Sequence, residues 1–418
     1  MQAEGELCVR LRVSADRVSQ VHVDSTRPDV ARALLQGRSL PEVHAAVPLL
    51  FSVCSRSQAT ASRLACAAAV GDDTGPAMLA HCAAAVTAES VREAAWRVLL
   101  DWPVLIGEKP AAEAVAAARA SLSWGDVVWG GSRERPADDR DARRMAQRAA
   151  QRIAHQLAAA VFAVGADAWL ALRSAAELDR WAGAGATAAA RFIRALRDDA
   201  AAPSSQTTDT ASFHCKNPQA DDIRRPPPEG DKKTWGGPAF PCETALLDTR
   251  NPAAWIAEIA DALDADPEFC RRPTWREAPA ETGALARCAS DPVVAELLHR
   301  PGPRILARYV ARLLELASLL SGVGTAAVGA RSLGRGAGIA WVENARGLLI
   351  HQVRQVGERV DAYRIVAPTE WNFHPCGALT AALLGAPARD LTALKQQAQR
   401  VVHSLDACVA CRIEIEHA

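Results

Sequence analysis

The sequence has no excess of either charge: its 418 residues include 48 lysines and arginines and 48 aspartates and glutamates. A protein that binds nucleic acid or an anionic membrane mainly through charge carries a basic surplus, so the composition argues against both partners. No apolar run reaches the roughly 18 residues that a membrane-spanning helix needs. The first residues also lack the basic and then apolar pattern of a signal peptide, so we expect a cytoplasmic protein.

Tyrosine is scarce, with two residues, whereas alanine dominates many segments and apolar residues make up 49% of the chain. Alanine is the strongest helix former, and apolar residues recur at helical spacing in segments such as 90–102, 141–172 and 304–320. Two other stretches, 5–24 and 345–373, alternate apolar and polar residues about a turn, which predicts a β-hairpin near each end. The pattern therefore indicates a mainly α (α+β) fold.

The composition changes at about residue 199, where proline, serine, aspartate and glycine become frequent. Such a composition is typical of a mobile linker or a long excursion from a folded domain. We expect residues 200–245 to be a flexible insertion or linker.

The chain has 11 cysteines, and a cytoplasmic location predicts thiols rather than disulfides. Five of them lie among apolar or helical neighbours and are interpreted as small core residues: Cys8, Cys66, Cys82, Cys270 and Cys288.

Cys408 and Cys411 form a Cys-x-x-Cys pair near the end of the chain, in DACVACRIEIEHA. A thioredoxin-like redox pair needs a helix after it, to lower the pKa of the first thiol, and few residues follow here. A structural zinc site needs two further ligands, and the sequence has no second Cys-x-x-Cys. A third interpretation is a metal site whose remaining ligand lies far away in the sequence.

Six fragments carry a resemblance that favours the third interpretation. Between residues 3 and 412 they follow in one order: AEGELCVR, VPLLFSVCSRSQATAS, ETGALAR, ENARGLLIH, VAPTEWNF and DACVAC. They resemble, in the same order, motifs of the large subunit of nickel–iron hydrogenases. This resemblance implies a single hydrogenase large-subunit-like domain over 1–418, a helical bundle in which small β-hairpins from both ends meet beside the metal.

In that family, two Cys-x-x-Cys motifs hold nickel, and the second cysteine of each also binds an iron that carries two cyanides and one carbon monoxide. By position, the resemblance makes Cys54 and Cys411 the iron-facing thiolates and Cys408 a remaining nickel-side thiolate. If so, the Cys54 and Cys411 sulfurs should lie within roughly 4 Å of each other, or a little more without metal, as Fe–S bonds require.

Three further residues match the family's pocket for the diatomic ligands: Arg346, Pro368 and Thr369. Guanidinium and hydroxyl donors suit a partly buried anion. Four others are candidate accessory groups: Glu4, which aligns with a proton-transfer glutamate, Asp406 of the last motif, and His374 and Cys376, which follow the pocket closely.

The sequence departs from the family pattern at several positions: the histidine that follows the early cysteine pair is Gln58, and two other departures weaken the nickel half of the site. The first cysteine of the early pair is Phe51, and Glu414 stands where the family has the histidine at which its maturation protease cuts. Nickel would have three sulfurs at most, whereas iron keeps both thiolates, which suit low-spin iron with strong-field ligands. Bound nickel and catalysis are therefore not expected.

The sequence is similar to the HupK/HoxV type of hydrogenase accessory protein. This similarity implies a non-catalytic scaffold that transiently binds the Fe(CN)2CO unit and passes it to the hydrogenase large subunit, with HypC/HypD-like maturation proteins as further partners. Two alternatives stay open: a metal-free interaction protein that mimics the large subunit and holds maturation factors, and a divergent hydrogenase large subunit.

Overall fold

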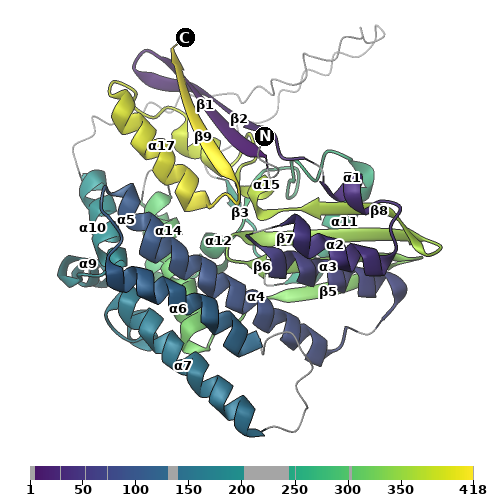
Figure 1. Ribbon diagram of the computed structural model, residues 1–418. Helices are drawn as coiled ribbons and strands as arrows, with labels where there is room; N and C mark the ends of the chain where they lie inside the picture. The colour runs from purple at the N-terminus through teal and green to yellow at the C-terminus, as the bar shows by residue number, and fades with distance from the viewer. Residues whose placement is uncertain are drawn as a thin grey trace, which may run out of the picture.

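The first and last strands of the protein share one sheet, which brings the two ends of the chain together (Figure 1). The computed structural model describes residues 5–28, 30–51, 53–72, 74–129, 140–201, 244–249, 251–300 and 304–417. β1 (Glu6–Ser14) and β2 (Arg17–Ser25) form the predicted N-terminal hairpin, and β9 (Ala410–His417) pairs with β1 in parallel. The sequence analysis missed β9, although its apolar and polar residues alternate.

A second sheet contains four antiparallel strands in chain order. They are β5 (Val328–Gly334), β6 (Ala337–Asn344), β7 (Gly347–Val356) and β8 (Arg359–Val366). β7 and β8 confirm the second predicted hairpin. β5 and β6 were not predicted, because glycine recurs through 329–338 and weakens the strand signal.

Helices cover both faces of this second sheet. α3 (Ser55–Val70) packs against one face, where Leu64 and Ala65 share a core with Val353. α11 (Ile256–Ala265) packs against the other, where Ile259 shares a core with Ile350. Alternate residues of β7 therefore point to α3 and to α11.

The largest core is a helical bundle around α14 (Ile305–Ser321). Trp102, Phe192 and Tyr309 meet at its centre with ring centroids 4.7 to 5.0 Å apart. Its other helices are α4 (Pro76–Trp96), the π-helical turn Arg97–Asp101, α5 (Trp102–Leu105), α6 (Ala112–Trp129), α7 (Arg140–Phe162), α8 (Ala166–Leu170), α9 (Ala175–Ala184), α10 (Ala188–Ala201), α12 (Ala284–Cys288) and α13 (Pro292–Leu298). The bundle confirms the mainly helical expectation.

The remaining elements join the bundle to the sheets. They are α1 (Val30–Leu35), α2 (Leu40–Leu50), β3 (Ala245–Leu246), the 3-10 turn Pro252–Ala254, β4 (Ala280–Glu281), α15 (Pro368–Asn372), α16 (Ala378–Leu383) and α17 (Leu391–Leu405). Among the described helices, none is both long and apolar enough to cross a bilayer. The predicted insertion at 200–245 lies almost entirely outside the described residues.

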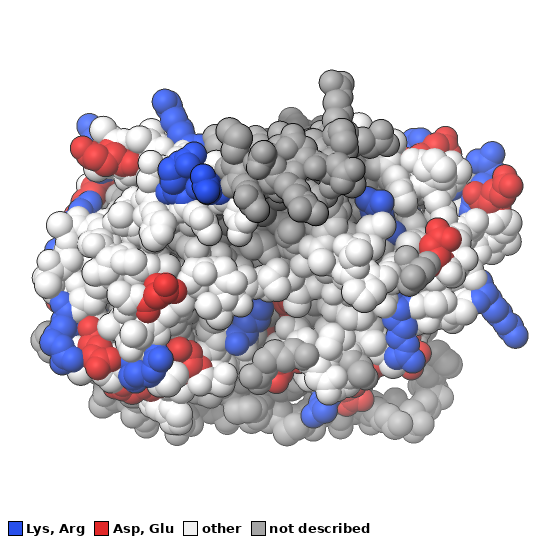
Figure 2. All heavy atoms as spheres, turned by 90° about the horizontal axis from the view of Figure 1, so that it is seen from below, with Lys and Arg blue, Asp and Glu red and all other residues white. Residues whose placement is uncertain are grey.

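The surface agrees with the balanced composition. In Figure 2, the basic and acidic side chains visible among the described residues are interspersed, with no continuous field of one sign. Such a face offers no electrostatic footprint for nucleic acid.

We predict that Gly338→Ala destabilises the protein, because β6 and α3 are in direct contact there. A Cβ at Gly338 would lie 2.3 Å from the Ala65 carbonyl oxygen and 2.5 Å from the Ala69 nitrogen. Overpacking of this kind costs about 1–3 kcal/mol, measurable by urea unfolding. Gly183→Ala is the control, because a Cβ in that helical position meets nothing within 4 Å; it should stabilise by about 0.5–1 kcal/mol. Equal effects of the two changes would contradict this packing.

Candidate metal centre

Cys54 lies at the N-cap of α3, and a buried glutamate fixes this helix start. Glu89 of α4 accepts hydrogen bonds from the backbone nitrogens of Arg56 at 2.9 Å and Ser57 at 3.0 Å, and from the Ser57 hydroxyl. Free N–H groups in a first helical turn need such an acceptor. Glu89 therefore sets where the Cys54 side chain begins.

Cys408 lies beside Cys54 and against α15. The Thr369 hydroxyl is 3.2 Å from the Cys408 sulfur, and Pro368 begins that short helix. Burial raises the pKa of Cys54 to about 12, and negative charge on Cys408 and Glu89 adds to the effect. The structure thus brings together Cys54, Cys408 and the predicted Pro368–Thr369 pair.

Arg346 joins this group from the turn between β6 and β7. Its backbone nitrogen donates to the Asn344 side chain at 2.9 Å, and its carbonyl accepts from Asn372 at 3.1 Å. Its guanidinium is buried and pairs with Glu93 at 2.9 Å. Burial lowers the Arg346 pKa, but Asp406, Glu93 and Cys54 raise it overall.

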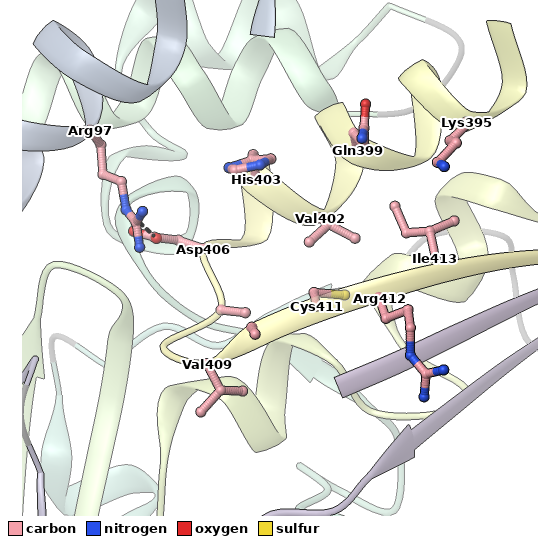
Figure 3. A pocket seen from close by; sticks show the side chains of 12 residues that line it. Arg97, Lys395, Gln399, Val402, His403, Asp406, Val409, Cys411, Arg412 and Ile413 are labelled. Carbon is pink, nitrogen blue, oxygen red and sulfur yellow. Dashed lines mark ion pairs between the residues drawn. The ribbon is translucent and has the colours of Figure 1, made fainter. Parts of the chain in front are cut away.

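Asp406 is the centre of a buried ion cluster. Its carboxylate lies 3.0 Å from Arg97 Nε, 3.5 Å from Arg312 Nη2 and 3.8 Å from Arg346 Nε (Figure 3 draws the Arg97 pair). Burial raises the pKa of Asp406, but the three arginines outweigh it and lower the value to about 2. The residue ends α17 in the left-handed conformation, so the cluster fixes the turn that leads to Cys408.

Arg27 is a site residue that the sequence analysis missed. It pairs with Glu370 of α15 at 2.5 Å, and both side chains are largely buried. Burial lowers the pKa of Arg27, but negative charge on Cys408, Glu370 and Cys54 raises it overall. A second guanidinium therefore stands near the two thiols. No motif marked it, because it follows β2 in an unpatterned stretch.

Cys411 is set apart from the other two thiols. In β9 it lies opposite Leu7 of β1, and its side chain packs against the core under α17 (Figure 3). Its pKa is raised to about 12 by burial and by Cys8 and Glu6. It lines a cavity of about 390 Å³ between α17 and β9, together with Lys395, Gln399, Val402, His403 and Ile413.

This position corrects the expectation that all three predicted thiols converge. Among the described residues, no three His, Cys, Asp or Glu side chains stand close enough to hold a metal ion. The reason lies in β9: its parallel register places Cys411, Ile413 and Ile415 on one face with the apolar residues of β1. Cys408 precedes the strand and escapes that constraint.

The remaining accessory candidates are His374, Cys376 and Glu4, and each has a different outcome. His374 is buried; its Nδ1 accepts from the Cys376 backbone nitrogen at 3.1 Å, and burial and Arg272 lower its pKa to about 4. Cys376 is disulfide-bonded, which corrects the expectation that the cysteines are thiols rather than disulfides. This residue would need reduction before it could bind a metal. Glu4 lies outside the described residues.

The core interpretation of the other cysteines is confirmed where they are buried, but not for Cys8, which is only partly buried and lies beside Glu414 of β9. Cys66 and Cys82 lie in the core beside α2 and α3. Cys270 and Cys288 pack against the edges of two other cores. Phe51 also packs against the core around α3.

Comparison with solved structures identifies the fold. The structure of the [NiFeSe]-hydrogenase of Dm. baculatum, crystallised under air, superposes on this chain with a TM-score of 0.54 at 15% identity. The superposition covers 96% of this chain and 95% of that chain. An NAD+-reducing [NiFe]-hydrogenase gives 0.53 at 15% identity, covering 95% and 94%. A family model described as nickel-dependent hydrogenase matches residues 306–414. The chain therefore has the hydrogenase large-subunit fold.

Three relatives that match more than 90% of this chain are named hydrogenase expression/formation proteins. The hydrogenase expression/formation protein HoxV of Cupriavidus necator is 27% identical over 403 residues, covering 93% of this chain and 91% of the relative. HupK of Rhizobium leguminosarum bv. viciae is 28% identical over 424 residues, covering 99% and 97%. The uptake hydrogenase large subunit of the latter organism matches over 84 residues, 19% of this chain, at 33% identity. The protein is thus a relative of HoxV and HupK.

We predict that Asp406→Asn destabilises the protein at neutral pH by roughly 3–5 kcal/mol, because it leaves buried arginines without their partner. The folded pKa of Asp406 lies below its ordinary 3.8, at about 2. Its charge therefore stabilises the fold above about pH 4, and about 2 kcal/mol of that is lost as the pH falls towards 2. The variant should lack this acid-induced loss in denaturant titrations at several pH values.

Asp16→Asn is the matched control for that experiment. Asp16 also has a left-handed backbone and pairs with an arginine, Arg389 at 3.2 Å, but both side chains are exposed. Exposed pairs contribute about 0–1 kcal/mol. Equal losses for Asp16→Asn and Asp406→Asn would show that burial of the cluster is irrelevant.

Proposed function

We propose that the protein acts in hydrogenase maturation as a non-catalytic scaffold for the Fe(CN)2CO unit, which it passes to a hydrogenase large subunit. The observation that carries the proposal is the meeting of Cys54 and Cys408 with Arg346 and Thr369 in one partly buried place. These residues come from segments far apart in the sequence. Names of the full-length relatives, as expression/formation proteins, support the same role.

The chemistry of this group fits an anionic iron fragment as cargo. Soft thiolates suit iron that carries strong-field diatomic ligands. The buried Arg346 guanidinium interacts with Cys54 as well as with Asp406 and Glu93, so it places a positive charge where bound cyanide would carry negative charge. Arg27 adds a second positive charge near both thiols, and the Thr369 hydroxyl adds a neutral donor beside Cys408.

Cys411 enters this proposal as a movable third thiol. Cys54 and Cys408 are the pair that we propose to hold iron, whereas Cys411 lines the cavity under α17. The family resemblance implies that Cys411 is an iron ligand. For that, residues 407–411 must change conformation so that the Cys411 side chain points towards Cys54 instead of the core under α17. Binding by Cys411 would break its strand pairing with Leu7, so release of the cargo would restore that pairing and face a lower barrier.

The departure at Phe51 argues against a complete nickel site and hydrogen-splitting activity. A phenyl ring offers no lone pair, and this one packs against the core around α3. Nickel would have three thiolates at most. The iron unit is therefore the cargo we propose, and nickel is not.

The partners we propose are a hydrogenase large subunit as receiver and HypC/HypD-like maturation proteins as suppliers. A metal-free alternative is favoured by one observation, the separation of Cys411 from the other thiols. In that case the protein would mimic the large subunit and hold maturation factors.

Infrared spectroscopy of protein purified without oxygen from cells that make the maturation proteins tests the proposal. We expect cyanide and carbonyl stretching bands in the wild type, and their loss in Cys54→Ala and Cys408→Ala. Cys66→Ala, a buried thiol in the same helix as the site, is the control and should retain them. Cys411→Ala should retain the bands if Cys54 and Cys408 alone hold the iron. It should lose them if residues 407–411 change conformation and Cys411 becomes a ligand.

Two other results would replace the proposal. A wild-type protein without these bands, with normal hydrogenase maturation in a Cys54→Ala strain, would establish the metal-free role. One nickel per chain with hydrogen-dependent dye reduction would make the protein a divergent hydrogenase.

A further inference from the structure

A chain of buried polar side chains ends on the Cys54 sulfur. The Tyr363 hydroxyl is 2.8 Å from His351 Nδ1, and His351 Nε2 is 2.8 Å from Gln58 Oε1. Gln58 Nε2 lies 3.7 Å from the Cys54 sulfur, one helical turn below it. Gln58 and His351 are at most 1% exposed, so water does not compete for these bonds.

The chemistry of these groups gives the chain a direction. Burial lowers the pKa of His351 to about 3, so the ring is neutral and carries one proton. The oxygen of Gln58 can only accept, which places that proton on Nε2. Nδ1 must then accept from the Tyr363 hydroxyl. Each group donates to the next, and the last donor, the Gln58 amide, faces sulfur.

We propose that Gln58, His351 and Tyr363 are positioning residues that direct a chain of hydrogen bonds onto the Cys54 sulfur and so set how strongly it donates electrons to the iron cargo. This inference rests on the proposed function. The glutamine stands where the hydrogenase motif has a histidine, and β7 supplies the imidazole from behind it instead. Because hydrogen bonds in a chain polarise one another, the remote hydroxyl strengthens the contact at sulfur.

The expected effect is electronic as well as structural. A hydrogen bond to a thiolate withdraws charge from sulfur, and the iron then returns less charge to its carbonyl ligand. Removing the bond makes iron richer in electrons and weakens the C–O bond. The carbonyl band should therefore move to lower wavenumber.

The test compares infrared spectra of loaded protein carrying Gln58→Met or Tyr363→Phe. Methionine matches glutamine in length but has no donor, so Gln58→Met should give the larger shift to lower wavenumber. Tyr363→Phe should give a smaller shift in the same direction, and it keeps the inference testable if Gln58→Met fails to fold. Gln352→Met is the control: this buried glutamine is on the same strand but contacts Ala260 of α11, on the opposite face. Its band should match the wild type.

A metal-free measurement separates this inference from the proposed function. Nitrogen-15 NMR of histidine-labelled protein, with His351→Gln to identify the signals, should show His351 neutral and protonated on Nε2 at neutral pH. Tyr363→Phe should keep that form, because the Gln58 oxygen still accepts, whereas Gln58→Met should lose it.

The possible outcomes decide each claim separately. Protonation on Nδ1, or an unmoved carbonyl band in both Gln58→Met and Tyr363→Phe, would overturn the directed chain. A wild type without any cyanide or carbonyl bands would overturn the proposed function, and the NMR result would then decide the chain alone.

Discussion

The buried carboxylate of Asp406 ties the candidate site to the rest of the molecule. Its three arginines come from separate parts of the fold: Arg97 from the turn after α4, Arg312 from α14, and Arg346 from the second sheet. A buried charge is tolerated only when it is paired, so these elements must close around the end of α17. Asp406 thereby places Cys408 near α15 and starts the strand that carries Cys411.

The fold could be predicted only where the chain's own pattern is strong. The helical periodicity of 304–320 and the alternation of 5–24 are local signals, and α14 and the β1–β2 hairpin follow them. The pairing of β9 with β1 joins residues about 400 positions apart, and no local rule reports such a contact. The family resemblance supplied that meeting of the ends, whereas periodicity did not.

The candidate site shows the same division. The motif resemblance singled out Cys54, Cys408, Arg346 and Thr369, and these residues lie near one another in the structure. It did not mark Arg27 or Tyr363, because these residues reach the thiols only through tertiary packing. It gave no role to His351, although the ENARGLLIH fragment ends on this residue. It also placed Cys411 with Cys54, whereas the register of β9 turns the Cys411 side chain towards the core under α17.

The fold constrains the cysteines of the site to different degrees, and this difference suits a carrier. Three contacts hold α3 in place, and with it Cys54 at its start. Glu89 accepts hydrogen bonds from the first helical turn, Gly338 allows β6 to pack closely against the helix, and His351 is hydrogen-bonded to Gln58 in the first turn. Cys408 lies on a short segment between Asp406 and β9, outside any helix or strand, whereas Cys411 is held in β9 by its pairing with β1. A catalyst needs every ligand of a metal held in one geometry. A protein that must release a metal fragment needs one fixed ligand to define the site and another that can leave it; in the scaffold proposed above, Cys54 is the fixed ligand and Cys408 is the one that leaves.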